Sequence, residues 1–195
     1  SITALDQVAG GFTGSAVTIG KFDGIHLGHQ KLIQELSSAA QEHAIQSVVV
    51  TFDRHPDALL KPGHAKLPII GPKQKRELVA EHDVDIMVTL PFNEELASLS
   101  PEQFVQSILV DGLNAKIVLV GEDFRFGKSG AGDVHLLHDL GQQLGFEVRV
   151  IASATIDGEK ISTSAIRESL DAGDVVKAQK MLGHVHTCVG IIEHG

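Results

Sequence analysis

Short runs of apolar, largely β-branched residues recur along the chain and separate segments with a different periodicity. The runs cover residues 16–19, 47–52, 85–90, 116–120 and 146–151. In the segments between them, apolar residues recur every three or four positions, as at Leu32, Leu36 and Ala40. These patterns predict strands that alternate with helices. Because the strand runs are almost continuously hydrophobic, both faces of their sheet should be covered, which predicts an α/β fold with a doubly wound, parallel, five-stranded sheet and helices on both faces.

Local signals at the ends of these segments support the same order of elements. Ser100 and Gln103 match the capping box that opens a helix, and Asp133 and Asp174 can cap the helices that follow them. Asp157-Gly158 is a pair typical of a hairpin turn. In a parallel sheet, ligands bind beyond the carboxyl ends of the strands. We therefore expect the site in three strand-end loops: GKFDGIHLGH (20–29), DRHPDALLKPG (53–63) and GEDFRFGKSGAGD (121–133).

Composition narrows the class of partner. The chain has 195 residues, of which 43% are hydrophobic, and this length suits one main domain with a sizeable core. A formal net charge of -9 argues against nucleic acid, although a small anion needs only a local cluster of donors. There is no apolar run long enough to span a membrane, no secretory signal in the opening SITALDQVAGG and only one cysteine, Cys188. We expect a cytoplasmic protein without membrane or nucleic-acid partners.

The loop from residue 20 to residue 29 carries the first candidate chemistry. Gly24 and Gly28 let the backbone turn tightly, and His26 and His29 lie where a helix should begin, so that its free N–H groups and dipole favour an anion. Each imidazole can donate a hydrogen bond to a phosphoryl oxygen. Alone, this short motif is better explained by a solvated loop residue and a helix cap, but the preceding strand, the FDG sequence and the following helix favour a phosphate site.

A second candidate for binding phosphate lies in ISTSAIR, residues 161–167. Ser162, Thr163 and Ser164 offer hydroxyl and N–H groups at a helix start, and Arg167 follows one turn later. Ordinary capping and a solvated arginine would explain the same residues. If the function is phosphate binding, this segment and the loop 20–29 should converge on one ligand.

The loop 121–133 contains Gly127-Lys128-Ser129 and superficially resembles a phosphate-binding P-loop. Five residues separate Gly121 from Gly127 where that motif has four, and glycines follow Ser129 where its helix should begin, so we reject this interpretation. Phe124 and Phe126 flank Arg125 and could hold a flat ring system, with Asp123 accepting a hydrogen bond from it. Packing of either phenylalanine on the core is an equally good explanation. His135 and His138 lack any metal-binding pattern and fit a solvated helix face.

Taken together and in order, TIGKFDGIHLGHQKL, TFDRHP, VGEDFRFGKSGAGD and ISTSAIRESLDAGDVVKAQKMLG closely resemble the FMN adenylyltransferase module of prokaryotic FAD synthetases, which is often fused to a riboflavin kinase. The resemblance runs from about Ser15 to Gly183. It implies a Rossmann-like nucleotidyltransferase that joins ATP and FMN to give FAD and pyrophosphate without a covalent enzyme intermediate. It also implies that Mg²⁺ accompanies ATP, and it assigns no protein residue as a metal ligand.

The resemblance also implies roles for individual residues. His26 and His29 would contact the ATP phosphates in the transition state, while Ser162, Ser164 and Arg167 would hold the outgoing pyrophosphate. The full ATP-binding set implied is Gly20, Phe22, Asp23, Gly24, His26, Gly28, His29, Ser162, Thr163, Ser164 and Arg167. The flavin-binding set implied is Phe52, Asp53, His55, Pro56, Asp123, Phe124, Arg125 and Phe126. Lys21 departs from the family pattern, because many relatives have asparagine there.

The resemblance places an adenylyltransferase domain at residues 1–185. Residues 186–195, HTCVGIIEHG, resemble the first strand of the kinase module, as in an excised fragment or a vestigial tail, and we expect no riboflavin kinase activity. Two other functions stay open. A related transferase could act on another phosphorylated acceptor, or a non-catalytic module could bind the nucleotide or flavin and signal to a partner.

Overall fold

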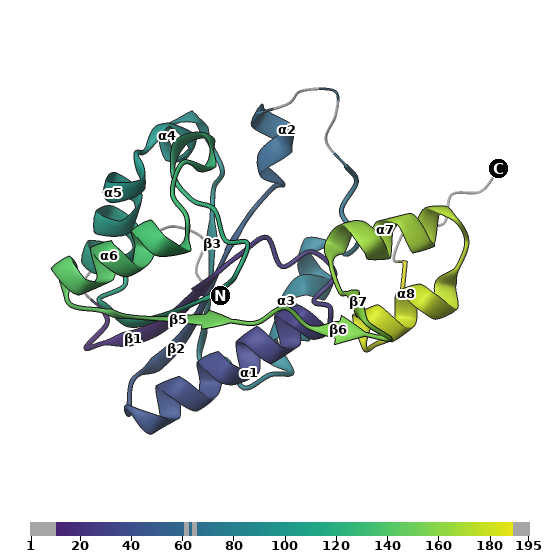
Figure 1. Ribbon diagram of the computed structural model, residues 1–195, viewed down its shortest axis with the longest axis horizontal. Coiled ribbons are helices and arrows are strands. Elements are labelled where there is room, and N and C mark those ends of the chain that lie inside the picture. The colour runs from purple at the N-terminus through teal and green to yellow at the C-terminus, as the bar shows by residue number, and fades with distance from the viewer. Residues whose placement is uncertain (1–10, 61–62, 64–65, 189–195) are drawn as a thin grey trace.

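Five parallel strands form one sheet at the centre of the protein (Figure 1). The structure, a computed structural model, describes residues 11–60, 63 and 66–188. The strands are β1 (Ser15–Ile19), β2 (Gln46–Phe52), β3 (Ile86–Leu90), β4 (Ala115–Gly121) and β5 (Glu147–Ile151). They lie in the order β3-β2-β1-β4-β5, and every neighbouring pair is parallel. Each strand falls on one of the five predicted apolar runs, so the predicted sheet is confirmed.

The remaining elements connect and cover these strands. The helices are α1 (Leu27–Glu42), α2 (Pro56–Leu60), α3 (Pro72–Ala80), α4 (Glu94–Ser98), α5 (Pro101–Phe104), α6 (Val134–Leu144), α7 (Thr163–Asp171) and α8 (Val175–Leu182). A π-helix (Val105–Gly112) continues α5, and Lys128–Gly130 form one 3₁₀ turn. The short strands β6 (Thr155–Ile156) and β7 (Glu159–Lys160) form the predicted hairpin.

Helices cover both faces of the sheet, as predicted. Successive residues of a strand point to opposite faces. Val17 and Val48 join a core cluster with side chains of α5, the π-helix and α6, whereas Ala16 and Val49 join one with side chains of α1, α3, α7 and α8. In Figure 1, α1 accordingly lies on one side of the sheet, and α5 and α6 on the other. The fold is therefore a doubly wound α/β sheet.

The capping signals in the sequence are confirmed by hydrogen bonds. The side chains of Ser100, Asp133, Ser162 and Asp174 each accept a hydrogen bond from the backbone N–H three residues later. The rejected P-loop is no phosphate loop in the fold either. Phe126 and Gly132 form a β-bridge across the 3₁₀ turn, and the next helix begins only at Val134.

Part of the domain prediction concerns residues at the end of the chain that the structure does not describe. The strand predicted near the C-terminus lies mostly in residues 189–195, which are not described, and Thr187 and Cys188 belong to no strand. Just before them, the ring Nε2 of His184 lies 2.9 Å from the carbonyl oxygen of Gly24, and that of His186 lies 3.1 Å from the carbonyl oxygen of Ile69. Over residues 11–60, 63 and 66–188, the structure contains no helix long and apolar enough to cross a membrane.

Gly183 ends α8 and packs against the start of α1, which makes it a test of how these helices dock. Its φ is 74°, and a Cβ there would lie 2.4 Å from Cδ2 of Leu27. Gly173 has a similar φ of 75° with no atom within 4 Å of an added Cβ. We expect Gly183→Ala to lower the free energy of unfolding by about 1–3 kcal/mol more than Gly173→Ala, because overpacking adds to the shared backbone strain. Urea denaturation of both variants measures the difference, and equal losses would contradict the tight contact.

Candidate active site

The turn between β1 and α1 holds two bulky residues in a left-handed backbone conformation. Phe22 has a φ of 48° and Ile25 a φ of 42°, with Gly24 between them at 87°. Such values are unusual for bulky or β-branched residues. Both side chains are nevertheless 0% exposed, in the core cluster that includes α1. Burial of Phe22 and Ile25 therefore holds the turn in a shape that local preference alone would not maintain.

Asp23 lies at the centre of this turn and ties it to two distant segments. Its carboxylate accepts hydrogen bonds from the backbone N–H groups of Ile69, at 2.8 Å, and Ile70, at 3.4 Å. Its other oxygen accepts a hydrogen bond at 2.6 Å from Nη2 of Arg167, and Nη1 of the same guanidinium donates to the carbonyl oxygen of Leu67. The side chains of Asp23 and Arg167 are only 8% and 14% exposed. This buried ion pair braces the turn against α7 and against residues 67–70.

His26 and His29 stack at the start of α1. His26 is the N-cap, and its Nδ1 accepts a hydrogen bond from the backbone N–H of His29 at 3.3 Å. The two rings lie with their centroids 3.7 Å apart and their planes at 19°. A Cβ at Gly28 would lie 3.1 Å from Cε1 of His26, so glycine leaves room for this ring over the first turn. The spacing H-x-G-H thus produces a compact pair of imidazoles at a helix N-terminus.

Both imidazoles are neutral at pH 7 in this arrangement. Burial lowers the pKa of His26 to about 4, although its own backbone and the charge of Asp23 act in the opposite direction. Burial also lowers the pKa of His29 well below its usual value, and the electrostatic effects of the neighbouring His26 and Lys75 act in the same direction. Because Nδ1 of His26 accepts a hydrogen bond, its ring proton lies on Nε2. Within the described residues, Nδ1 of His29 is buried without a hydrogen-bond partner.

A pocket of about 280 Å³, here called the histidine pocket, opens beyond the carboxyl ends of β1, β4 and β5. Its wall combines Gly20, Phe22, His26, Gly28 and His29 with Ser162 and Thr163 of the α7 start and with Glu122, Asp123, Phe124, Ser153 and Lys160. The predicted convergence of loop 20–29 with the hydroxyl-rich helix start is therefore present. The pocket lies where chain connections diverge between β1 and β4, the usual place for a ligand in such sheets.

A larger pocket of about 560 Å³, here called the cationic pocket, lies beyond β2 and β3 on the other side of the turn. Apolar side chains of Phe52, Ile70 and Met87 line part of it. Its positively charged lining residues are Lys21, Arg54, Lys66, Lys75 and Arg76. Lys21 and Asp23 belong to this wall, while Gly20, Phe22 and His26 belong to the wall of the histidine pocket. One turn therefore separates the two pockets.

The predicted ATP-binding residues do not all lie in one pocket. Gly20, Phe22, His26, Gly28, His29, Ser162 and Thr163 line the histidine pocket. Asp23 lines the cationic pocket instead. Gly24 packs toward Leu182, Ser164 is exposed, and Arg167 is engaged with Asp23; none of the three lines either pocket.

The predicted flavin-binding residues are divided between the two pockets. Phe52, Asp53 and His55 line the cationic pocket, whereas Asp123 and Phe124 line the histidine pocket. Pro56 opens α2 and lines neither.

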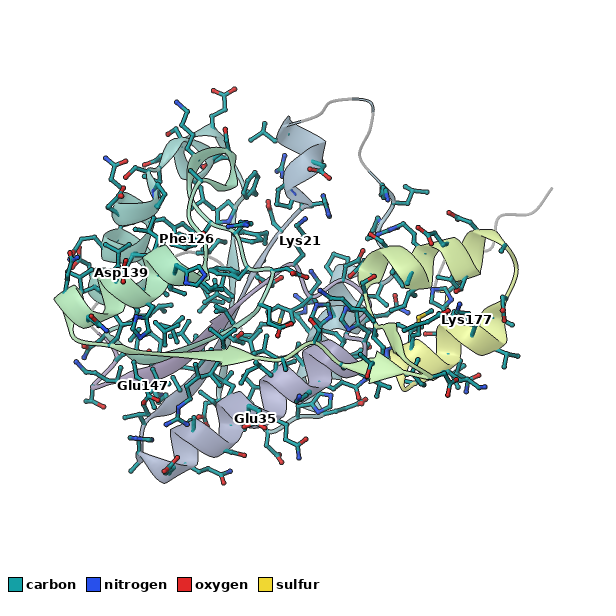
Figure 2. All side chains as sticks on the ribbon, in the orientation of Figure 1. Lys21, Glu35, Phe126, Asp139, Glu147 and Lys177 are labelled. Atoms are coloured by element: carbon teal, nitrogen blue, oxygen red, sulfur yellow. The ribbon has the colours of Figure 1, made fainter. Side chains whose placement is uncertain are left out.

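Arg125 and Phe126 line neither pocket. Arg125 forms an ion pair with Asp133 at 3.2 Å, and Phe126 is 5% exposed and packs against Phe104. Figure 2 shows Phe126 beside α5 and α6, away from Lys21. Of the two explanations for Phe126, core packing is the one that its burial supports.

Two pocket residues, Lys75 and Lys160, were not predicted from the sequence. Lys75 of α3 donates hydrogen bonds to the carbonyl oxygen of Lys21 at 2.8 Å and to Oγ1 of Thr51 at 3.3 Å. Lys160 of the hairpin forms an ion pair with Asp123 at the histidine pocket. A cluster of basic residues in PKQKREL was the available signal for Lys75, but a charged helix usually reads as a solvated face.

Comparisons with known proteins identify the family to which the chain belongs. The family model for FAD synthetase matches residues 11–165. The chain belongs to the FAD synthetase family. Bifunctional riboflavin kinase/FMN adenylyltransferases from Buchnera aphidicola (subsp. Schizaphis graminum) and from Escherichia coli K12 are 36% and 32% identical to it over 182 residues. The alignments cover 93% of this chain but 58% of those relatives.

Two solved structures of other proteins have a fold similar to that of this chain. A crystal structure of a macrolide-efflux protein from Streptococcus pneumoniae matches with a TM-score of 0.84 and 30% identity, over 94% of this chain and 60% of that one. A pantoate-beta-alanine ligase from Francisella tularensis matches with a TM-score of 0.55 and 14% identity, over 94% and 78% of the two chains. At that identity the second likeness shows a shared fold alone.

The buried, neutral His26 makes stability depend on pH. Its pKa is about 4 in the folded chain and near 6.5 when unfolded, so the unfolded chain binds more protons between these values. The free energy of unfolding should therefore rise with pH from about 4 to about 6.5, by at most about 1.4 kcal/mol per pH unit for this one group. His26→Asn keeps a good N-cap and should flatten the slope, while His43→Asn, at an exposed position, should not. Denaturant titrations at several pH values measure how the free energy of unfolding changes with pH. The same pH dependence in wild type and His26→Asn would contradict the buried neutral ring.

Proposed function

We propose that this chain is an FMN adenylyltransferase, which transfers AMP from ATP to FMN and releases FAD and pyrophosphate. Family membership and the names of the curated relatives support this function. One structural observation carries it: two pockets share the β1–α1 turn as a common wall, and only one of them contains the stacked histidines. A reaction between two phosphate-bearing substrates needs two such sites side by side.

The chemistry requires no nucleophile from the protein. A phosphate oxygen of FMN attacks the α-phosphorus of ATP and forms the new P–O–P bond. The bond from the α-phosphorus to the oxygen that bridges to the β-phosphate breaks, and its electron pair leaves with pyrophosphate. Catalysis of such a transfer consists of positioning and of stabilising charge on the phosphoryl oxygens.

In this proposal the histidine pocket binds the nucleotide. The N–H groups at the start of α1 and the Nε2–H of His26 are donors suited to phosphoryl oxygens. A bound triphosphate would raise the low pKa of His26 and His29, so that the rings gain a proton and a positive charge where phosphate charge must be stabilised. Ser162 and Thr163 add hydroxyl groups from the opposite wall and would hold the outgoing pyrophosphate. Ser164 and Arg167 line neither pocket, so Arg167 would act on the site through Asp23.

Mg²⁺ is expected to arrive with the nucleotide. This ion keeps several waters and is usually held by one or two carboxylates together with substrate phosphates. Across the described segments the structure has no cluster of three acidic, histidine or cysteine side chains, but Glu122 and Asp123 both line the histidine pocket. That donor set fits a phosphate-bound ion, which would supply charge neutralisation on the phosphates.

The cationic pocket is the proposed flavin site. Its volume of about 560 Å³ lies in the range of small-molecule sites, and Phe52, Ile70 and Met87 offer apolar surface to a ring system. His55 and Asp53, which the family resemblance assigns to the flavin, line the same pocket. Asp123 and Phe124 lie across the turn, where they would reach the flavin only near the junction of the two pockets.

Two other functions give different results in simple assays. A related transferase with another acceptor would release pyrophosphate from ATP with that acceptor and not with FMN. A non-catalytic sensor would bind ATP or flavin and release no pyrophosphate with any acceptor. The apolar lining of the cationic pocket favours a flat, largely apolar acceptor such as a flavin over a small polar one.

Incubation with ATP, FMN and Mg²⁺ should yield FAD and pyrophosphate, detected by chromatography and by a coupled pyrophosphate assay. His29→Asn should lower kcat by roughly 100- to 1000-fold, the usual cost of losing one group that stabilises transition-state charge. His135→Asn, the same change at an exposed position on α6, should leave turnover unchanged. Normal turnover in His29→Asn would remove His29 from the mechanism, and absence of FAD with the wild-type chain would reject the proposed function.

A further inference from the structure

The lining of the cationic pocket is positively charged, in contrast to the chain as a whole. The protein carries a formal net charge of -9, yet five lysine and arginine side chains line this pocket against two carboxylates, Asp23 and Asp53. Both carboxylates are already engaged. Asp23 is bonded to Arg167 and to two backbone N–H groups, and Asp53 accepts hydrogen bonds from Arg54 and, at 2.8 Å, from the backbone N–H of Phe92. The wall therefore offers a surplus of positive charge to an anionic ligand.

Lys75 is the cation of this wall that lies against the shared turn. Its ammonium donates to the carbonyl oxygen of Lys21, at the start of the turn, and to Oγ1 of Thr51, near the end of β2. Thr51 donates in turn to the same carbonyl oxygen at 3.1 Å. An ammonium has three N–H donors, so these contacts leave one uncommitted. Among the described residues, the structure records no carboxylate within ion-pair distance of Lys75.

The environment of Lys75 indicates that its charge acts on both pockets. Burial lowers its pKa, and the nearby charge of Asp23 opposes that change. The charge of Lys75 is also one of the causes that lower the pKa of His29, which lines the other pocket. An anion bound beside this ammonium would relieve the cost of its partial burial, because an opposite charge favours the ionised form.

The other cations of the pocket are less suited to bind a phosphate at the turn. Arg54 is paired with Asp53 at 3.3 Å. Lys66 and Arg76 are exposed, and so is the side chain of Lys21. Exposed charges are screened by water and salt, whereas a partly buried ammonium interacts more strongly with a ligand.

On the basis of the proposed function, we propose that Lys75 is a further catalytic residue: its free N–H binds the phosphate of FMN and holds the attacking oxygen at the junction of the two pockets. Riboflavin, which has the same ring system without the phosphate, should gain nothing from this contact. Lys75 would thus make the chain prefer the phosphorylated acceptor, and it would offset repulsion between the two anionic substrates where they meet.

Flavin binding to Lys75→Met tests this role without catalysis. Quenching of flavin fluorescence gives the Kd of FMN and of riboflavin for each protein. We expect Lys75→Met to weaken FMN binding by roughly 10- to 100-fold, the range for losing a charge-assisted hydrogen bond, and to leave riboflavin binding unchanged. Lys73→Met, the same change on the same helix at an exposed position paired with Glu77, should alter neither. Equal weakening of both flavins, or no weakening of FMN, would overturn the assignment.

Two further measurements keep the test decisive if Lys75→Met fails to fold. Lys75→Gln retains a donor for the carbonyl oxygen of Lys21 without the charge, and it should show the same selective loss of FMN binding. In the wild-type chain, FMN should slow acetylation of Lys75 more than riboflavin does, while acetylation of Lys73 should respond to neither. Equal protection by both flavins would again overturn the role of Lys75.

The outcomes separate this role from the proposed function. A wild-type chain that binds FMN through Lys75 but forms no FAD would reject the adenylyltransferase and retain the phosphate contact. A chain that forms FAD while Lys75→Met keeps its preference for FMN over riboflavin would reject Lys75 alone.

Discussion

Burial of Phe22 and Ile25 beneath a left-handed turn is the constraint on which the two-pocket site depends. Holding each residue in that backbone region costs roughly 1–2 kcal/mol, and burying each large apolar side chain returns roughly 1.5–3 kcal/mol. The two effects are similar in size, so the turn persists only because the core beneath it is complete. The backbone above those side chains forms the wall between the histidine pocket and the cationic pocket.

Asp23 extends this constraint to segments that are far away in the sequence. It bonds to Ile69 and Ile70 on one side and to Arg167 of α7 on the other. A buried carboxylate that loses one partner leaves an uncompensated charge, so these contacts support one another. His184 and His186 add contacts to Gly24 and Ile69 from the segment after α8. The positions of both pocket walls are thereby coupled, although only the turn itself belongs to both.

Local patterns predicted much of this arrangement, and its non-local contacts account for what they missed. Apolar runs located every strand of the sheet, and caps such as Asp133 and Ser162 depend on residues only three positions away. The position of His26 and His29 at one helix start was also predicted, but the stacking of their rings was not. Lys75 was not predicted, because its significance comes from contacts with Lys21 and Thr51 on other elements.

The loop 121–133 shows the same limit within a single motif. Phe124 and Phe126 look equivalent in the sequence, yet the bridge to Gly132 turns the chain back and buries Phe126 while Phe124 reaches the histidine pocket. Periodicity assigns residues to faces of regular strands and helices, but it has no rule for a loop whose direction depends on a contact six residues later. The sequence alone therefore does not distinguish the phenylalanine that packs in the core from the one that lines the pocket.

The two anionic substrates of the proposed reaction would pose an electrostatic problem that the division into two pockets would address. Like charges repel strongly where water is excluded, so phosphates can meet only where positive charge or donors are fixed in advance. In the histidine pocket, His26 and His29 are neutral, which avoids the cost of burying two unpaired charges, and an anion bound there in the proposed reaction would raise their pKa. In the cationic pocket, the ammonium of Lys75 donates to one carbonyl oxygen and one hydroxyl oxygen, which solvate its charge. In the proposed reaction, positive charge would thus develop in the histidine pocket when the nucleotide binds and would be present beforehand in the cationic pocket, and this asymmetry would let a chain with a net charge of -9 bring two phosphates together at one turn.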